Sequence, residues 1–313
     1  MLTNDINQLV FFDFEMLCSN RGMAYEDMEA IRLGAVKYNT TSKTISTFER
    51  YIKPTTTSPL TTFCKKLTGI TDEDLQDADD FKTVFTEFIL WIEDIVSTRF
   101  YSWSPSDITR LAIDSKRHKL DATLITMIEK RYNDFQATFT KFVSKDNYSV
   151  ENALQLFELP FVGEQHNPLF DAYNTLRIYL AYIDQPVLSD QIMLKQYFSY
   201  TLSHHPTEIN EFLYTTIKQD IHFLLLNTEQ IYTIREAKKK VKEIKRLARK
   251  YNNIMINRSG LFTETNRQLI TCILSFYREL VSCYKEHRNF SSKIMILDDF
   301  MFEQFQQYYS KEG

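Results

Sequence analysis

The stretch Leu9-Val10-Phe11-Phe12-Asp13-Phe14-Glu15 decides how the first half of this 313-residue chain is expected to fold. It is a short apolar run, rich in Val and Phe, which is typical of a buried β-strand. Side chains alternate across a strand, so Asp13 and Glu15 project from one face while Phe12 and Phe14 point to the other. Two such carboxylates repel each other unless a proton or a cation compensates, and their oxygens suit Mg²⁺ or Mn²⁺.

An Asp-x-Glu pair is a weak signal by itself, because Asp27-Met28-Glu29 repeats it nearby. The first copy is distinguished by its place at the end of an apolar strand. The simpler interpretation of that copy, an exposed strand end with acidic residues, stays open at this level.

Outward from this strand, residues 30–38 and 47–52 predict a second and a third strand, and together the three indicate an antiparallel meander. Residues 99–103 predict a fourth, central strand. Helices are expected at residues 59–68, 79–94, 107–119, 134–145, 150–157 and 168–182. Three strands followed by helices and one more strand imply an α/β fold with a mixed sheet flanked by helices.

Three further polar residues stand at predicted helix starts. Asp107 follows the fourth strand, where Ser106 is expected to cap a helix. His166 and Asp171 lie five apart around Asn167, the expected cap of the last helix, with Pro168 at its favoured first position. Acidic residues are common in the first turn of a helix, so Asp107 and Asp171 each have a purely structural explanation too.

Composition excludes several classes of protein. The chain has only 6 glycines and contains neither a GxGxxG nor a GxxxxGK[ST] phosphate loop. It has no apolar stretch of roughly 20 residues and no basic-then-apolar start, so neither a membrane span nor a signal peptide is expected. Four widely spaced cysteines suggest neither a disulfide framework nor a zinc site. We therefore expect a cytoplasmic protein with reduced thiols.

The two halves of the chain differ in charge. Residues 1–185 hold 19 Lys and Arg against 27 Asp and Glu, whereas residues 186–313 hold 18 against 14. The second half shows helical periodicity and no clear strand, so we expect an all-α C-terminal domain at 186–313 after a first domain at 1–185. Its residues 235–250 hold nine Lys and Arg. That basic helix favours either contact with nucleic-acid phosphates or a solvated face, and less a membrane surface, because its apolar stripe is narrow.

Several segments taken together carry a family resemblance. They are Phe11-Phe12-Asp13-Phe14-Glu15, Tyr51-Ile52-Lys53-Pro54, Phe63-Cys64-Lys65-Lys66-Leu67-Thr68-Gly69-Ile70-Thr71, Trp103-Ser104-Pro105-Ser106-Asp107, Leu159-Pro160-Phe161 and His166-Asn167-Pro168-Leu169-Phe170-Asp171-Ala172-Tyr173-Asn174. Over residues 7–184 the chain resembles the DEDDh exonucleases of the DnaQ-like, RNase H-fold superfamily. It is most similar to the branch of histone-mRNA 3′ exonucleases and RNA-interference-attenuating exonucleases, and to bacterial predicted exonucleases.

The resemblance implies an RNase H-like mixed five-stranded sheet and a metal-dependent 3′→5′ exonuclease that releases nucleoside 5′-monophosphates. It implies two Mg²⁺ or Mn²⁺ ions held by Asp13, Glu15, Asp107 and Asp171, with Glu15 and His166 as catalytic residues and His166 as the general base. Side chains expected to touch the terminal nucleotide are Phe14, Met16, Leu17, Leu67, Ile70 and Asn167. For each of the apolar ones, ordinary core packing is an equally good interpretation.

The substrate and the partners stay open. The segment Phe63–Thr71 favours RNA over single-stranded DNA, and no membrane is expected. The alternatives are a non-catalytic nucleic-acid or regulatory binding module on the same fold, and a DNA proofreading or repair exonuclease. The C-terminal helical domain is a candidate to bind a protein partner or to form a dimer.

Overall fold

The computed structural model describes residues 6–198, 205–256, 259–290 and 292–309. The chain divides into two compact units, the first formed by residues 1–140 and 146–184 and the second by 141–145 and 185–313. The division into domains 1–185 and 186–313 stays a prediction. Among the described residues, no helix combines the length and the apolar character that a bilayer crossing requires.

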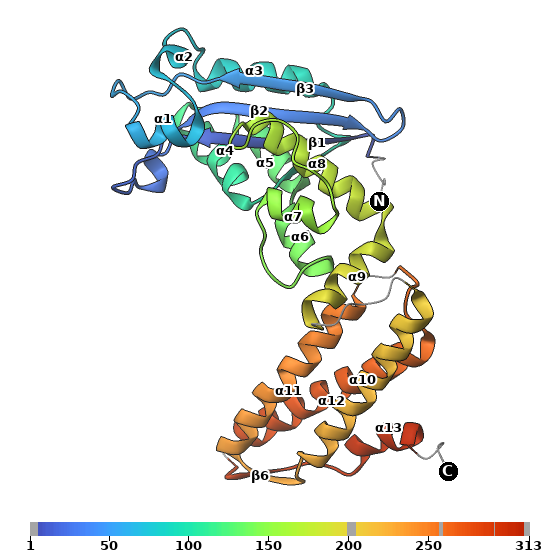
Figure 1. Ribbon diagram of the computed structural model, residues 1–313. Coiled ribbons are helices and arrows are strands. Elements are labelled where there is room, and N and C mark those ends of the chain that lie inside the picture. The colour runs from blue at the N-terminus through green and yellow to red at the C-terminus, as the bar shows by residue number, and fades with distance from the viewer. Residues whose placement is uncertain (1–5, 199–204, 257–258, 291, 310–313) are drawn as a thin grey trace. The chain divides into compact units, whose positions relative to one another are not determined.

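The first unit is built on a five-stranded sheet with the order β3-β2-β1-β4-β5 (Figure 1). Its strands are β1 (Gln8–Met16), β2 (Ala30–Asn39), β3 (Ile45–Tyr51), β4 (Thr98–Ser102) and β5 (Tyr132–Asp134). The first three strands are antiparallel neighbours, and β4 and β5 join in parallel. The predicted mixed sheet is therefore confirmed, and it places β1 at the centre.

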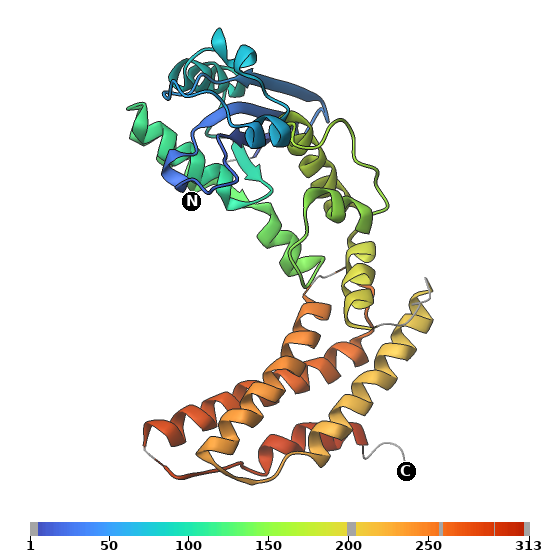
Figure 2. The same ribbon diagram turned by 60° about the vertical axis from the view of Figure 1, so that its left-hand side comes forward.

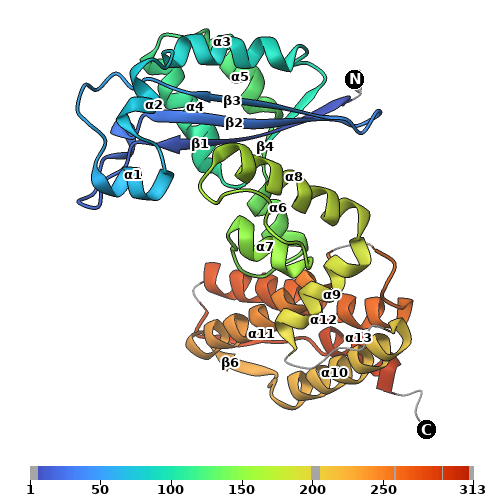
Figure 3. The same ribbon diagram turned by 45° about the horizontal axis from the view of Figure 1, so that its top comes forward.

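The alternation of side chains along β1 separates two cores. Val10, Phe12 and Phe14 face a cluster with α3 (Phe81–Ile92), α4 (Pro105–Arg117) and α5 (Ala122–Arg131). Leu9 and Phe11 face α8 (Pro168–Asp184) through Ala172 and Leu176. Figure 3 shows α3 and α5 on one side of the sheet and α8 on the other. Since Asp13 and Glu15 continue the series of Leu9 and Phe11, their carboxylates lie on the α8 side.

The remaining elements of this unit are short. They are η1 (Tyr25–Asp27), α1 (Thr62–Thr68), α2 (Asp72–Gln76), α6 (Phe135–Phe142) and α7 (Val150–Leu156). Gly69 ends α1, with a left-handed φ of 70°. The sequence pattern did not locate α2, α5 or β5. A strand of three residues is too short to display a period of two, which explains why β5 escapes a search for alternation.

The predicted cap of α4 is wrong by two residues. Ser104, rather than Ser106, is the N-cap of this helix, and its side chain accepts a hydrogen bond from the Ser106 backbone N–H. Pro105 then takes the first helical position, where a missing N–H costs nothing. Asp107 consequently lies inside the first turn instead of at its start.

The second unit is mainly helical, as expected. Its helices are α9 (Pro186–Tyr197), α10 (Pro206–Leu226), α11 (Ile234–Met255), α12 (Glu264–Asn289) and α13 (Phe300–Tyr309). The prediction of an all-α region is wrong in one detail, because β6 (Ile231–Thr233) and β7 (Ile294–Ile296) form an antiparallel two-stranded sheet. These strands are 63 residues apart and three residues long, so only the packed chain brings them together.

Candidate active site

The end of β1 supplies two carboxylates. Asp13 is paired with Gly34 of β2 in the antiparallel register, and Glu15 is paired with Arg32. The register shifts between Glu15 and Met16, so the strand is irregular directly after the second carboxylate. Irregularities of this type re-aim side chains at the end of a ladder.

The start of α8 supplies the third carboxylate. The Asn167 Oδ1 atom accepts hydrogen bonds from the backbone N–H groups of Leu169 at 3.0 Å and Phe170 at 3.4 Å, which confirms the predicted cap. Asp171 therefore lies in the first turn, and its backbone N–H reaches the Asn167 carbonyl at 2.9 Å. Asn167 was also expected to contact substrate. In the structure its side-chain oxygen is used by the helix.

Gly34 is a positioning residue that the sequence analysis missed. A Cβ atom placed on Gly34 would lie 2.0 Å from the Leu169 backbone N and 2.2 Å from the Pro168 carbonyl carbon. Only a glycine lets the start of α8 approach β2 this closely, directly beside the strand that carries Asp13. The available signal was a glycine inside a strand pattern, which often marks a close backbone approach.

His166 stands at the exposed end of the loop that precedes α8. Its φ is 60°, a left-handed conformation that few non-glycine residues adopt. Gly163 lies in the same loop and packs closely against Phe170. A Cβ atom placed on Gly163 would lie 2.2 Å from the Phe170 ring. The His166 backbone N–H also hydrogen-bonds the Asp171 carboxylate, so the two residues are fixed relative to each other.

Asp107 brings a buried carboxylate from the other side of β1. The residue is 3% exposed, and its Oδ1 atom accepts the Phe14 backbone N–H at 3.2 Å. The Ser102 hydroxyl also hydrogen-bonds this carboxylate. Asp107 is thereby tied to the same strand segment that carries Asp13 and Glu15.

One cavity of about 370 Å³ is lined by all five residues that the sequence singled out: Asp13, Glu15, Asp107, His166 and Asp171. Carboxylate oxygens of Asp13, Glu15 and Asp171 lie within 4.8 Å of one another. The structure therefore gathers residues that are up to 158 positions apart in the sequence. The other residues that line the cavity are Phe14, Met16, Trp103, Ser104, Ser106, Ser149, Val150, Glu151, Phe161 and Gln165.

The crowding of these carboxyls shows in their pKa values. Burial raises the pKa of Glu15 to about 8, with further increases from Asp171 and Asp107 and a smaller decrease from Arg32. Burial likewise raises the pKa of Asp107 to about 7 and that of Asp171 to about 6. The pKa of Asp13 is raised well above its ordinary value by burial and by the neighbouring acids.

This donor set fits divalent cations. Among the described residues, no Lys, Arg or His side chain forms an ion pair with any of these four carboxylates. Carboxylates that converge within 4.8 Å and form no ion pair destabilise the fold when they are ionised. Oxygen ligands of this type favour Mg²⁺ and Mn²⁺ over softer metals.

The predicted contacts with substrate divide into two groups. Phe14, Leu17 and Ile70 are 4%, 7% and 0% exposed and pack in the core. Leu17 and Ile70 lie outside the lining of the cavity, which favours core packing for them, whereas Phe14 also lines the cavity and stays a candidate for substrate contact. Met16 lines the cavity, and Leu67 is 40% exposed on α1, so both stay candidates.

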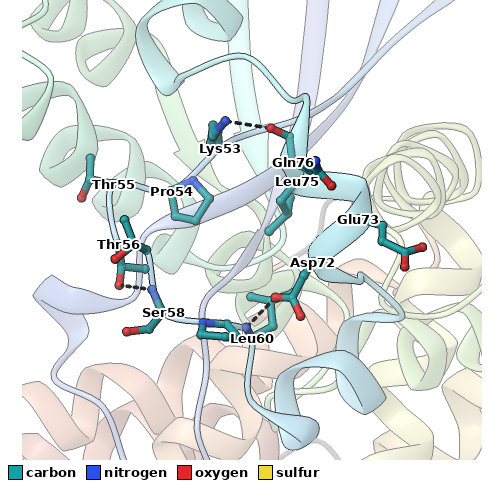
Figure 4. A pocket seen from close by; sticks show the side chains of 12 residues that line it. Lys53, Pro54, Thr55, Thr56, Ser58, Leu60, Asp72, Glu73, Leu75 and Gln76 are labelled. Carbon is teal, nitrogen blue, oxygen red and sulfur yellow. Dashed lines mark hydrogen bonds between the residues drawn. The ribbon is translucent and has the colours of Figure 1, made fainter.

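A second, larger hollow of about 570 Å³ lies between the loop after β3 and α2 and contains none of the five residues (Figure 4). Several of its polar groups are already used locally. Lys53 Nζ donates to the Gln76 carbonyl at 2.7 Å, and Asp72 accepts the Leu60 backbone N–H at 2.7 Å. We therefore assign the chemistry to the smaller cavity with the carboxylates.

Comparisons with known proteins agree with this geometry. The human protein "ERI1 exoribonuclease 2" is 28% identical over 189 residues, which cover 53% of this chain and 27% of the relative. The rat "3'-5' exoribonuclease 1" is 28% identical over 181 residues, covering 54% of this chain and 51% of the relative. This chain thus spans about a quarter to a half of the length of these curated relatives.

Solved structures show the same fold. The nuclease domain of 3'hExo, described as a DEDDh family member bound to rAMP, matches with a TM-score of 0.52 and 22% identity. The match covers 57% of this chain and 92% of that domain. Cell-death related nuclease 4 matches with a TM-score of 0.51 and 22% identity, over 57% of this chain and 64% of that one.

The sequence model of the RNase T exonuclease family matches residues 10–179, which is more than half of the chain and includes all five residues of the cavity. The family model thereby confirms the predicted exonuclease family, and the structural matches confirm the predicted fold. This protein belongs to the RNase T family of exonucleases.

Proposed function

We propose that this protein is a metal-dependent 3′→5′ exonuclease that releases nucleoside 5′-monophosphates from RNA or single-stranded DNA. The observation that carries the proposal is the convergence of Asp13, Glu15 and Asp171 within 4.8 Å in a cavity that Asp107 and His166 also line. Membership of the exonuclease family supports the reaction class. The names of the curated relatives, which are called exoribonucleases, support RNA as the preferred polymer.

The four carboxylates would hold two Mg²⁺ or Mn²⁺ ions. When bound, these ions supply Lewis acidity toward the scissile phosphate and lower the pKa of water. Glu15 and Asp13, fixed on a central strand, give the site a rigid wall. Asp107 is the most deeply buried of the four, and its hydrogen bond from the Phe14 N–H holds one oxygen in place. Rigid placement of this kind lowers the entropy lost when substrate binds.

His166 is the proposed general base. Its imidazole is exposed at the entrance of the cavity, where a water molecule has access to it. The hydrogen bond from the His166 backbone N–H to the Asp171 carboxylate holds the backbone that carries this imidazole beside the carboxylate cluster. A positioned imidazole takes a proton from an attacking water near neutral pH. The base is thus separate from the residues that would hold the ions.

The experiment that tests this function uses pure full-length protein with Mn²⁺ or Mg²⁺ and 5′-labelled single-stranded RNA and DNA of the same sequence. We expect stepwise shortening from the 3′ end, release of 5′-monophosphates and faster hydrolysis of RNA. A 3′-phosphorylated substrate is the control for the direction of attack. Shortening from the 5′ end, or internal cleavage, would contradict the proposal. A lack of hydrolysis with either ion would favour a non-catalytic binding module.

Asp27 provides a matched control for the acidic residues. It belongs to the second Asp-x-Glu pair, is exposed and lies outside the cavity. Asp27→Asn is expected to leave hydrolysis unchanged, whereas Asp13→Asn is expected to abolish it.

Preferential hydrolysis of DNA by the wild-type protein would point to the proofreading or repair alternative. Dimer formation through residues 186–313 is tested by the mass of the protein in solution.

A further inference from the structure

Helix α11 of the second unit carries a cationic face along most of its length. Its buried side is formed by Ala237, Ile244, Ala248, Tyr251 and Ile254, which pack it into the helical core. Residues 235–250 hold nine Lys and Arg against two Glu. Among the described residues, Lys240 pairs with Glu243 at 3.0 Å and Lys250 pairs with Asp220 at 2.9 Å. Most of the positive charge of the helix is therefore left to face solvent.

Part of this charge borders a groove between α11 and α12, two helices that lie side by side (Figure 2). The groove has a volume of about 480 Å³, and seven residues line it: Lys245, Ala248, Arg249, Asn252, Leu274, Tyr277 and Arg278. None of these is acidic. In the part of the chain that the structure describes, neither Lys245, Arg249 nor Arg278 forms an ion pair with a carboxylate. The groove is thus open to an anionic occupant.

The groove also has an aromatic and apolar floor. Ala248 is buried and Leu274 and Tyr277 are half-buried, whereas the three cations of the groove are exposed. Arg278 is held by its own helix, because its Nε atom donates to the Leu274 carbonyl at 3.3 Å and its guanidinium donates to the Ser275 hydroxyl at 3.0 Å. A fixed guanidinium loses less entropy when it binds a phosphate. Cations around a ring are the features that bind a nucleic-acid single strand.

The charged face continues beyond the groove. Lys238, Lys242, Lys245 and Arg249 are all exposed and recur at intervals of three and four residues, so they lie on one side of α11. Eleven residues of helix separate the first from the last, which corresponds to about 16 Å. A row of this length matches an extended polyanion of several phosphates better than a single small anion.

We propose that the α11–α12 groove binds single-stranded RNA, with backbone phosphates on Lys245, Arg249 and Arg278 and a base stacked on Tyr277. The choice of RNA rests on the proposed function, because a strand of the polymer that the enzyme degrades has the matching charge. Single-stranded RNA can present unstacked bases to an aromatic side chain, whereas a duplex offers mainly its backbone. The second unit therefore holds a site for substrate that is separate from the catalytic cavity.

The test measures binding of a fluorescein-labelled single-stranded RNA by anisotropy, with the full chain carrying Asp13→Asn to prevent hydrolysis. The groove variant is Lys245→Gln with Arg249→Gln. Each single-strand phosphate contact contributes about 0.7 to the slope of log affinity against log salt. Loss of two contacts is expected to lower the slope by about 1.4 and the affinity about 15-fold at 0.15 M salt. Tyr277→Leu is expected to lower affinity about 5-fold or more with an unchanged slope.

A matched control removes the same charge from the same helix. Lys239 and Arg246 are exposed, lie outside the groove and project roughly 100° round the helix from Lys245. Lys239→Gln with Arg246→Gln is expected to change affinity less than 3-fold. An equal loss of RNA affinity in the two double variants would mean that the overall charge of the helix attracts RNA. That result would overturn the proposed binding site in the groove. Unchanged RNA affinity in the groove variant, with lost binding to vesicles of phosphatidylserine and phosphatidylcholine, would overturn it in favour of a membrane surface.

Binding and catalysis are read separately. If the wild-type protein hydrolyses neither RNA nor single-stranded DNA yet binds RNA through the groove, the proposed function fails and this inference stands. If the protein hydrolyses RNA and the groove variants bind it as tightly as their parent does, the inference fails and the function stands.

Discussion

Replacing Asp171 with asparagine removes one of three carboxylates whose oxygens lie within 4.8 Å of one another. The substitution keeps the shape of the side chain and an oxygen that can accept the His166 backbone N–H. Because the remaining acids lose a like-charged neighbour, we expect the metal-free protein to become more stable. The same change is expected to abolish hydrolysis and to weaken metal binding.

The magnitude follows from the pKa of Asp171. Burial raises this pKa from 3.8 to about 6, so the folded protein binds the proton more tightly than the unfolded chain does. Stability from this group is fully present below pH 4 and is lost as the pH rises through 6. At pH 8 the loss is at most about 3 kcal/mol, since each pKa unit corresponds to about 1.4 kcal/mol and the side chain keeps some solvent contact. An asparagine at this position does not incur this loss of stability. The Tm of the variant at pH 8 is therefore expected to exceed that of the wild type by up to about 10 °C.

The chain offers a selective probe for this measurement. It has two tryptophans, Trp91 and Trp103, and both lie in the first unit. Intrinsic fluorescence during heating in EDTA therefore reports the unfolding of the unit that carries Asp171. We expect the variant to exceed the wild type in Tm at pH 8 and to match it within about 3 °C at pH 4. Asp27→Asn, at an exposed position in the short helix η1, serves as the control and is expected to shift neither value.

Added Mn²⁺ provides the second half of the test. A ligand that binds only the folded state raises its stability by mass action, so the wild type is expected to gain Tm with Mn²⁺ concentration. The variant is expected to gain much less. An unchanged or lower Tm for the variant at pH 8 in EDTA would refute the electrostatic reasoning. If Mn²⁺ raises the Tm of the variant as much as that of the wild type, Asp171 is not a ligand of the cation.

Four further outcomes are expected. His166→Ala is expected to lower kcat about 10²- to 10⁴-fold while the Tm gain with Mn²⁺ persists, and near wild-type turnover would remove the imidazole from the mechanism. Asp13→Ala is expected to lose both hydrolysis and the response to Mn²⁺ in the same fluorescence assay; unchanged Mn²⁺ affinity would contradict its role as a ligand. Gly34→Ala is expected to lower the free energy of unfolding by about 1–3 kcal/mol and to weaken Mn²⁺ binding, because the new Cβ pushes the start of α8 away from β2. Hydrolysis at the wild-type rate would show that the close approach of α8 to β2 is dispensable. Mn²⁺ affinity, measured by calorimetry, is expected to rise from pH 6 to about pH 8, because the cation binds the ionised form of Glu15, whose pKa is about 8; a flat profile would exclude such proton release.

Local patterns predicted much of the first unit. The alternation in β1 placed Asp13 and Glu15 on one face, and this is a property of any strand whatever surrounds it. The cap at Asn167 followed from its side-chain oxygen and from the proline behind it. Such features depend on neighbours within a few residues, so they can be recognised from the sequence before any packing is known.

Burial could not be predicted in the same way. Leu17 and Ile70 were expected at the site but pack in the core outside the lining of the cavity, because an apolar side chain gives no indication of which surface will cover it. The pairing of β6 with β7 and the close approach of Gly34 to Leu169 join segments that are distant in sequence. Long-range contacts of this kind depend on the whole fold.

The second unit shows the same division between sequence and structure. The sequence by itself determined that residues 235–250 form a basic helix, and it determined which five residues in the first half carry the family pattern. Only the tertiary structure decided that Tyr277 and Arg278 of α12 line a groove with Lys245 and Arg249, and that four carboxylates share one cavity. The physical reason is that charge and periodicity belong to each segment, whereas cavities and raised pKa values arise only when segments exclude water together.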